Sequence, residues 1–444
     1  MRIMLTALIS PFCEIPVLDS LRHSLLPAPH SRIFAVCSEN HSLNDQTFPF
    51  FVITSLLIFW LVMVSIQLIF VLFIFSRTAF SVFPPPVSLS ENKHPAQQGV
   101  TVVICARNEL DNLTELLPLL DAQHYPTFEI LVMDDRSTDG TTAFLENIAT
   151  ERNHIRFIRI DKEHEHVTPK KYALTIALKK ALYPTVLLTD ADCRPASADW
   201  ITQMVSQLAT ADKQLVLGFS PYEHRPGFLN LLIRSETLFT AVQYFSLALA
   251  GRPYMGVGRN LAYRTQLFFA NRGFYSHMNV VGGDDDLFVN EVATGQNTAV
   301  CLDPATFMWS KPKETWVDWR LQKRRHLNVG NYYTFGNKFR LGLLTGSHVL
   351  TWLTGLFVGA VILYHEIAHY AFTPDEWLLL LIATGTFAFR ILAFWGIVGR
   401  ISYRLAHTVP WSIMPFMDLL LATYYGIAGL QTIISRRKKR ITWR

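Results

Sequence analysis

Apolar residues in this chain follow two patterns: long uninterrupted runs toward both ends, and short runs in the middle. The run Phe50–Phe75 carries no charge. Its length of about 26 residues exceeds the roughly 20 that a helix needs to cross a membrane. Three similar runs follow later, at Gly346–Tyr364, Trp377–Ile397 and Trp411–Ile434. The pattern predicts a transmembrane helix over residues 48–77 and transmembrane or interfacial helices over 341–435.

Between residues 99 and 336, short apolar runs alternate with helical patterns. The runs are VTVVICA, FEILVMDD, IRFIRI, TVLLTDAD and LVLGF. They are rich in Val, Ile and Leu without alternation, which is typical of strands covered on both faces. Helical patterns occupy Asn112–Leu120, Thr141–Thr150 and Lys170–Leu182. We therefore expect an α/β domain with a Rossmann-like, mostly parallel sheet over residues 99–336.

Composition and charge place this domain beside a membrane. Half of the 444 residues are hydrophobic and only 17% are charged, too apolar for an ordinary soluble enzyme. Arg77 and Lys93 follow the first long run, and positively charged loops stay inside. This predicts a multi-pass protein of the inner (plasma) membrane with a cytosolic domain. The small net charge of +5 is explained by the membrane and requires no nucleic acid partner.

The flanking segments and two features of the long runs carry further expectations. Residues 1–47 show no clear periodicity; disorder is one interpretation, and no function is assigned to them. Residues 436–444 form a basic tail suited to anionic lipid. Arg390 lies within a long run, so it should face other helices or snorkel. The run Trp411–Ile434 is expected to be re-entrant or interfacial, because a third full C-terminal span would put the basic tail outside.

An acidic triplet, Asp190-Ala191-Asp192, ends the fourth predicted strand. Side chains two apart on an extended chain point to the same side, so both carboxylates can face one point. Oxygen ligands of this kind suit a hard divalent cation shared with a substrate phosphate. Taken alone, the triplet fits a solvated turn equally well.

A second acidic motif, DDRSTDGT over Asp134–Thr141, ends the second predicted strand. Its first two carboxylates can accept hydrogen bonds from a nucleobase N–H and ribose hydroxyls. Ser137 and Asp139 can cap the helix that follows. A simple helix-capping turn is the alternative interpretation.

Two more motifs follow in the second half of the domain. GGDDDLF (Gly282–Phe288) places three carboxylates in a row, so at least one should have a raised pKa or a cationic partner. Such a carboxylate can act as a base, although helix-dipole stabilisation would also explain it. QKRRHLNVG (Gln322–Gly330) suits a pyrophosphate, or a basic helix lying on the membrane surface.

The ordered set VTVVICARNE, DDRSTDGT, PKKYAL, TDADC, GVGRNLAYR, GGDDDLF and QKRRH resembles membrane-associated bacterial-type members of glycosyltransferase family 2. The resemblance covers residues 99–335 and implies a GT-A catalytic domain. It also implies inverting transfer of a sugar from a nucleotide diphosphate sugar, a UDP-sugar by preference, with Mg or Mn as the divalent cation. Because the chain has membrane runs, we expect a lipid or membrane-bound glycan acceptor.

The resemblance also implies roles for individual residues. Glu109 and Asp135 would contact the uridine part, with Asp134 beside them. Lys170 occupies the basic position of the family's Gly-Lys element, where Pro169 replaces glycine.

Metal and proton-transfer roles follow in the same way. Asp190 would lie near the sugar phosphate and share the metal with Asp192, the main ligand. Asp285 matches the aspartate of the family's Glu-Asp pair and would be the general base, with Asp284 where Glu is usual.

Gln322 and Arg325 match the Gln-x-x-Arg-Trp element of processive synthases and would contact the donor. His326 replaces its tryptophan, which favours transfer of a single sugar over a processive polysaccharide synthase.

Three interpretations stay open beside this one. HEIAH (His365–His369) matches the zinc-protease pattern, although no third ligand stands nearby. An inactive scaffold member of the family is another. The segment Phe228–Leu249 either lines the acceptor entrance or packs on the sheet.

Overall fold

The computed structural model describes residues 53–82, 99–367, 372–406 and 409–434. Within these residues, seven strands form one sheet in the order β3-β2-β1-β4-β7-β6-β8. The strands are β1 (Val100–Ala106), β2 (Phe128–Asp135), β3 (Ile155–Ile160), β4 (Thr185–Asp190), β6 (Leu215–Leu217), β7 (Leu261–Arg264) and β8 (Thr298–Val300). β7 runs antiparallel to both of its neighbours, β4 and β6. The mostly parallel α/β sheet is therefore confirmed.

Helices cover both faces of this sheet, as the unalternating apolar strands require. Val102 of β1 packs with α3, α4 and α6, whereas its neighbour Val103 faces α5, α7 and α9. The helices of the domain are α3 (Leu110–Asp121), α4 (Thr141–Glu151), α5 (Pro169–Lys180), α6 (Trp200–Ser206), α7 (Phe228–Leu249), α8 (Thr265–Ala270), α9 (Asp286–Val292) and α10 (Trp316–Val329). A separate two-stranded sheet pairs β5 (Cys193–Pro195) with β9 (Met308–Ser310).

The register of the parallel strands brings the predicted motifs together. Asp134 at the end of β2 lies opposite Ala106 of β1, and Asp190 at the end of β4 lies opposite Cys105 of β1. Three acidic or polar loops consequently leave adjacent strands at one edge, where open α/β sheets bind ligands.

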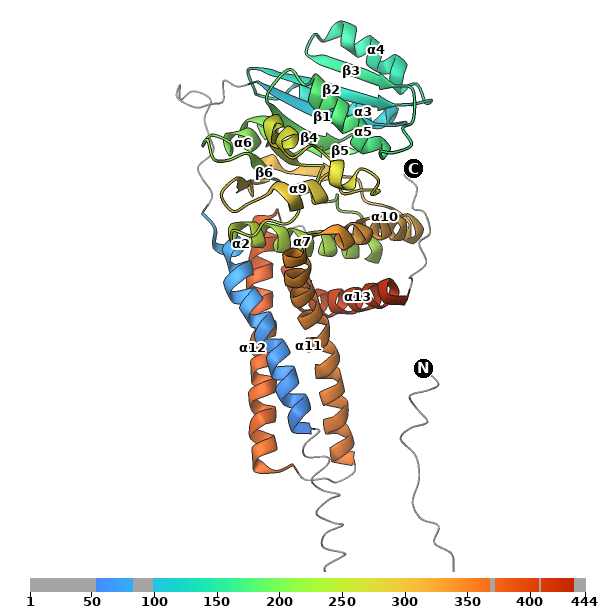
Figure 1. Ribbon diagram of the computed structural model, residues 1–444. Coiled ribbons are helices and arrows are strands. Elements are labelled where there is room, and N and C mark those ends of the chain that lie inside the picture. The colour runs from blue at the N-terminus through green and yellow to red at the C-terminus, as the bar shows by residue number, and fades with distance from the viewer. Residues whose placement is uncertain (1–52, 83–98, 368–371, 407–408, 435–444) are drawn as a thin grey trace, which may run out of the picture. The chain divides into compact units, whose positions relative to one another are not determined.

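Four helices among the described residues are long and apolar enough to cross a membrane: Ile53–Phe80, Phe335–Tyr364, Pro374–Arg404 and Trp411–Gln431. The first ends in η1 (Phe70–Phe75) and α2 (Ser76–Phe80); the others belong to α11 (Phe335–Ile367), α12 (Pro374–Arg404) and α13 (Met414–Ile434). In Figure 1, α7 and α10 lie between the sheet and the long helices, and α13 runs across the direction of α11 and α12. A re-entrant or interfacial position of α13 stays a prediction.

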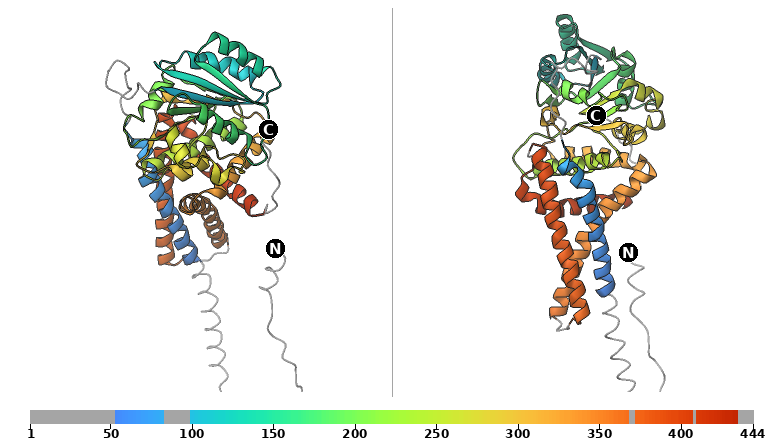
Figure 2. Two further views of the ribbon diagram at one scale, coloured as in Figure 1. Left: turned by 45° about the horizontal axis from the view of Figure 1, so that its top comes forward. Right: turned by 90° about the vertical axis from the view of Figure 1, so that its left-hand side faces the viewer.

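Helix α7 packs against both the sheet and the long helices. The Tyr244 hydroxyl donates to the Gly218 carbonyl at 2.9 Å, and Ser246 pairs with Thr78 of α2 at 2.7 Å. Phe239 of α7 contacts Phe75 and Phe394 from two different long helices. The packing role expected for this segment is thus confirmed, and its role at the acceptor entrance stays a prediction. In the right-hand view of Figure 2, the yellow-green α7 again lies between the sheet and the long helices.

A buried polar cluster joins the long helices. The Arg390 guanidinium of α12 pairs with Asp418 of α13 and donates to Gln67 at 3.0 Å. Asp418 also meets the His348 ring at 2.8 Å and accepts from the Trp352 indole at 3.0 Å, both on α11. Arg390 therefore faces other helices, one of its two expected positions.

The outermost segments, 1–47 and 436–444, and part of the HEIAH motif lie outside the described residues.

Substitution of Asp418 by Ala should lower the free energy of unfolding by about 3–5 kcal/mol, because Arg390 loses the anion that compensates its burial. Thermal unfolding in detergent measures this loss. Asp375→Ala, which removes an exposed carboxylate from α12, is the matched control and should change little. An Asp418→Ala protein as stable as the control would show that the pair does not hold α13.

Candidate active site

Two loops at the edge of the sheet are hydrogen-bonded to each other before any ligand binds. The Asp139 carboxylate accepts from the Leu110 N–H at 3.1 Å, and the Asn108 side-chain oxygen accepts from the Thr138 N–H at 2.8 Å. Ser137 accepts from the Asn108 N–H at 2.9 Å. Asp139 thus binds the first turn of α3 as well as Thr141 of its own helix α4. Asp139, which we expected to cap only the helix that follows it, therefore also joins its loop to the loop before α3.

Asp134 is buried, and its own loop uses both of its oxygens. One accepts from the Ser137 N–H at 3.2 Å, and the other accepts from the Thr142 hydroxyl at 2.5 Å. Asp134 therefore supports its own loop, as the capping-turn interpretation expects, because a buried carboxylate must satisfy its oxygens locally. Its contact with the donor stays a prediction.

Asp135 and Glu109 remain directed toward the edge of the sheet. Asp135 pairs through both oxygens with Arg136, at 2.8 and 3.2 Å, and each oxygen keeps a further lone pair. Glu109 is half-buried and accepts from the Asn112 amide at 2.7 Å. Burial raises the pKa of Glu109, and the nearby carboxylates of Asp192 and Asp190 raise it further, although Asn112 opposes the shift. Glu109 therefore lies on the side of the acidic triplet.

Lys170 brings three separate motifs into one place. Its ammonium lies 2.9 Å from Asp190 and 3.2 Å from Asp284. Burial opposes its charge, but the two carboxylates together raise the pKa of Lys170 well above its ordinary value. The neighbouring Lys171 is fully buried and donates to the carbonyls of His277 and Val280 at 2.7 and 2.8 Å. One lysine thus neutralises the site, and the next one fixes the loop that leads to the three aspartates.

Each of the three consecutive aspartates has a different environment. Asp284 pairs with Lys170. Asp285 begins α9 and accepts from the Gly258 N–H at 2.6 Å and the Asp286 N–H at 2.8 Å. Burial and then the Asp284 carboxylate raise the pKa of Asp285 to about 6. Burial and both other aspartates raise the pKa of Asp286 well above its ordinary value, and Tyr333 is its hydrogen-bond partner. Asp284, Asp285 and Asp286 thus show both expected features, a cationic partner for one carboxylate and raised pKa values for the other two.

Two glycines allow the backbone around Asp285 to adopt its conformation. Gly283 has a left-handed φ of 73°, and a Cβ there would lie 2.7 Å from Leu287. At Gly258 a Cβ would come within 3.0 Å of the Asp285 carboxylate, where it would crowd the hydrogen bond.

Asp192 has no compensating cation as close as the one at Asp190. Its nearest hydrogen-bond partner among the described contacts is the Cys193 thiol, at 3.5 Å. Burial raises the pKa of Asp192, and the Asp190 carboxylate raises it further. Although burial opposes it, the Lys170 ammonium lowers the pKa of Asp190. The two members of the triplet therefore differ: one is neutralised by protein and the other is not.

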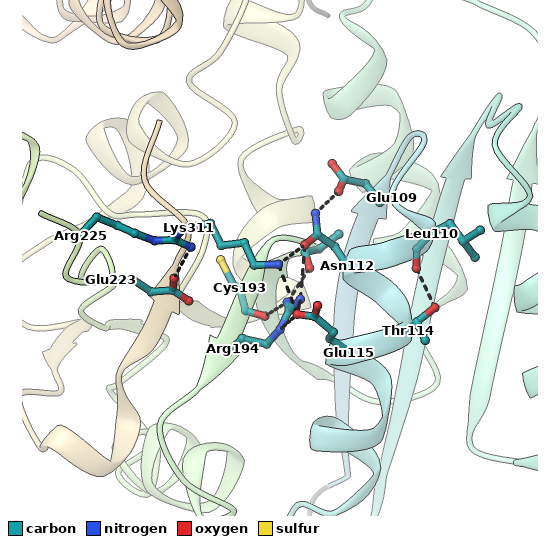
Figure 3. Close-up of polar contacts among 11 residues, drawn as sticks. Glu109, Leu110, Asn112, Thr114, Glu115, Cys193, Arg194, Glu223, Arg225 and Lys311 are labelled. Atoms are coloured by element: carbon teal, nitrogen blue, oxygen red, sulfur yellow. Dashed lines mark hydrogen bonds and ion pairs between the residues drawn. The ribbon is translucent and has the colours of Figure 1, made fainter. Parts of the chain in front are cut away.

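Arg194 fixes the acidic triplet against α3. Figure 3 shows its guanidinium between the turn and the helix: it donates to the Cys193 carbonyl at 2.6 Å and to Glu115 at 2.6 Å. It also reaches the Ala191 carbonyl at 3.1 Å. Lys311 joins the same group through Glu115 at 3.3 Å. Sequence reasoning missed Arg194, although its place directly after the triplet was an available signal.

The basic motif lies on α10 and faces the site from the opposite side. The Gln322 amide donates to the Tyr222 hydroxyl at 3.1 Å, and Lys323 pairs with Glu236 of α7. Four cationic side chains lie near enough to His326 to lower its pKa: Lys323, Arg259, Arg325 and Lys170. The charges of Arg325 and Lys170 thus reach one region, as expected for an anionic ligand. Gln322 supports Tyr222 through this hydrogen bond, and its expected contact with the donor stays a prediction.

Comparison with known proteins agrees with this geometry. Residues 101–266 match the family model described as Glycosyl transferase family 2. A stretch of 130 residues, 29% of this chain, is 26% identical to Glycosyltransferase AglE of Haloferax volcanii. The match spans 41% of that relative's length.

A solved structure shares the fold. It is the mannosyltransferase PcManGT from Pyrobaculum calidifontis in complex with GDP-Man and Mn2+. The similarity covers 87% of this chain and all of that one, with a TM-score of 0.51 and 18% identity. It confirms the expected GT-A fold.

We expect Asp134→Ala to lower the free energy of unfolding by about 1–3 kcal/mol, because buried donors lose their acceptor. Binding of a nucleoside to the folded protein should change little. Thermal unfolding and calorimetric titration measure the two effects. Asp161→Ala, an exposed aspartate with 74% of its side chain accessible, is the control. Loss of nucleoside binding without loss of stability would show instead that Asp134 contacts the nucleoside directly.

Proposed function

We propose that this chain, which carries a glycosyl transferase family 2 domain over residues 101–266, transfers one sugar from a nucleotide diphosphate sugar to a membrane-associated lipid acceptor with inversion. One observation carries the proposal. The Lys170 ammonium lies between Asp190 and Asp284, so a single side chain bridges the end of β4 and the loop that carries the candidate base. A displacement at a sugar carbon requires the group that stabilises the leaving diphosphate and the group that removes the acceptor proton to be adjacent.

The donor would bind along the edge of β2, β1 and β4. Asp135 and Glu109 retain lone pairs for a nucleobase and ribose, and Asp134 holds their loop. Lys170 and Arg325 would face the diphosphate, where cations stabilise the charge of the leaving group. A uracil base is our preference from the family resemblance. The mannosyltransferase with the same fold was solved with a guanine nucleotide, so both bases belong in any test.

The residues present fit a divalent cation. Asp192 is a half-buried carboxylate with no ion pair among the described contacts, although Arg259 is near enough to lower its pKa, and hard cations take such oxygens together with those of a diphosphate. Within the described part of the chain, no three acidic, His or Cys side chains gather to hold a metal, so donor oxygens would complete the coordination. When bound, Mg or Mn would offset the charge that develops on the diphosphate. Asp192 would be the main ligand, with Asp190 on the same turn.

Asp285 would remove the acceptor proton. As the acceptor oxygen attacks the anomeric carbon, its proton passes to the carboxylate of Asp285. The bond from that carbon to the phosphate oxygen breaks, and its electron pair leaves with the diphosphate. Two backbone N–H groups orient Asp285, and a pKa of about 6 suits a base that works near neutral pH. Attack opposite the leaving group inverts the configuration of the sugar.

The acceptor is proposed to be a lipid because of where the site lies. Helix α10, which bears Arg325, is separated from the long α11 only by η5 (Gly330–Tyr332) and two further residues. Figure 1 places α10 and α7 between the sheet and the long helices. A lipid hydroxyl or phosphate at that level would reach Asp285 without leaving the membrane surface. The inner membrane and a cytosolic domain remain our proposal for its location.

The test of this function is incubation of membranes containing the chain with labelled UDP- and GDP-sugars and Mn²⁺, followed by lipid extraction and mass spectrometry. Label in one lipid species, dependent on the chain, is the expected result. Label confined to a water-soluble polymer would contradict the lipid acceptor and favour a processive synthase.

Asp285→Asn should abolish sugar transfer, by at least about 100-fold in kcat, while nucleotide binding persists, because the base is lost. For the unchanged protein, kcat/KM should fall as pH drops below about 6, since protonation of Asp285 removes the base. Asp286→Asn is the matched control: its raised pKa favours the neutral carboxyl, which Asn resembles. Full turnover by Asp285→Asn would remove this assignment.

Asp192→Asn should weaken the effect of Mn²⁺, so that donor binding becomes nearly independent of the cation. Titration of the nucleotide diphosphate with and without Mn²⁺ measures it. Asp199→Asn, an exposed aspartate just beyond the same turn, provides the comparison. If Mn²⁺ strengthens binding equally in the two variants, Asp192 is not a ligand.

A further inference from the structure

Arg259 is a half-buried cation that none of the contacts above uses. It stands in the segment Gly256–Asn260, which leads into β7. Both of its neighbours are fixed: the Gly258 N–H donates to Asp285 at 2.6 Å, and the Asn260 amide donates to the carbonyls of Phe219 and Thr306 at 2.7 and 2.8 Å. The backbone of Arg259 is therefore held in place, beside the candidate base.

The side chain of Arg259 is stacked and incompletely paired. Its guanidinium carbon lies 4.5 Å from the centroid of the Tyr222 ring. One terminal nitrogen, Nη1, is buried and has no hydrogen-bond partner in the described part of the protein. A buried guanidinium N–H without an acceptor costs about 1–3 kcal/mol or more, so native proteins seldom leave one unused. An acceptor from outside the protein is the simplest way to satisfy it.

Tyr222 is itself held by α10. Its hydroxyl accepts from the Gln322 amide at 3.1 Å, which forms a chain from Gln322 through Tyr222 to Arg259. A planar cation stacked on a fixed ring has few orientations, so its free N–H groups point in a defined direction. Burial opposes the charge of Arg259, yet Tyr222, Cys193, Asp192 and Asp190 raise its pKa, so the cation persists beside the acidic triplet.

We propose that Arg259 binds a phosphate oxygen of the substrate through Nη1, and that Tyr222 and Gln322 position it. The inference rests on the proposed function and adds a residue to its site. A phosphate fits because the guanidinium presents parallel N–H donors to it, and because the site already gathers Lys170 and Arg325.

Two sources could supply that phosphate. The nearby Asp190 and Asp192 suggest the donor diphosphate, whereas the hydrogen bond between Asp285 and Gly258, the residue before Arg259, suggests a lipid phosphate. The chemistry is shared, and binding experiments separate the sources.

The experiment measures binding by the full chain in detergent or nanodiscs, with Mn²⁺ present. The probes are UDP and GDP, the matching nucleosides, and nanodiscs containing polyprenyl phosphate or polyprenol. Arg259→Gln should weaken binding of a phosphate-bearing probe by about 10- to 100-fold, the usual effect of losing a hydrogen bond between charged groups. Nucleoside and polyprenol binding should change less than about twofold. Arg225→Gln, an exposed arginine with 48% of its side chain accessible, is the control.

The two arms identify the source. Weaker binding of the nucleoside diphosphate alone assigns Arg259 to the donor, and weaker binding of polyprenyl phosphate alone assigns it to the acceptor. A folded Arg259→Gln protein that binds both like the unchanged chain overturns the proposal. These measurements need no turnover. If no sugar is ever transferred but the diphosphate affinity still falls, the proposed function fails and the phosphate site stands.

The positioning role of Tyr222 and Gln322 is tested separately, by phosphate binding to variants of these two residues. Tyr222→Phe keeps the ring and removes only the link to Gln322, so it should weaken phosphate binding by about three- to fivefold. Gln322→Leu should do the same, and the double variant should be no worse than either single one. Thermal unfolding confirms that each variant folds. Fully additive effects would show that the two side chains act separately and would overturn the positioning chain.

Discussion

The ion pair that the site depends on is the Lys170 ammonium between Asp190 and Asp284. Five carboxylates from two motifs lie near one another here, and their mutual repulsion would favour neutral acids or an open loop. The half-buried Lys170 ammonium, 2.9 and 3.2 Å from Asp190 and Asp284, compensates these two. Asp192, Asp285 and Asp286 have no such ion pair among the described contacts, and their pKa values are raised. Two of these three, Asp192 and Asp285, are the carboxylates to which we assign metal binding and proton transfer.

The arrangement is held by contacts that do not touch a substrate. Lys171 fixes the carbonyls before the three aspartates, Arg194 fixes the turn of the acidic triplet, and Gly258 gives Asp285 a backbone donor. Lys171 and Gly258 join segments that are distant in the sequence, and Arg194 does so through Glu115 of α3. Geometry within a fraction of an ångström matters for catalysis, because misplaced groups lose the benefit of pre-orientation. Lys171 and Arg194 are therefore polar side chains that position the site and do not take part in the reaction.

Sequence reasoning succeeded where a local pattern has a single physical outcome. Runs such as VTVVICA and FEILVMDD can hardly be anything but buried strands, and parallel strands place their final residues at one edge. The predicted strands therefore placed the acidic motifs at one edge of the sheet.

Partners within the site could not be predicted, because they depend on tertiary approach. Nothing in the sequence indicates that Asp134 turns inward to Ser137 and Thr142, or that Gln322 meets Tyr222, a hundred residues away. Short strands such as β7, four residues long and antiparallel, also carry too little pattern to be recognised.

The four long apolar helices also bury charged groups, and they compensate these charges in the same way. Arg390 and Asp418 are almost completely inaccessible, and Gln67, His348 and Trp352 complete their hydrogen bonds. That cluster ties α13 to the long helices. Tyr424 of α13 stacks near Trp319 of α10, at 5.6 Å between ring centroids. Because α10 also carries Gln322 and Arg325, the Trp319–Tyr424 contact connects the helix of the proposed phosphate site with the polar cluster of the long helices.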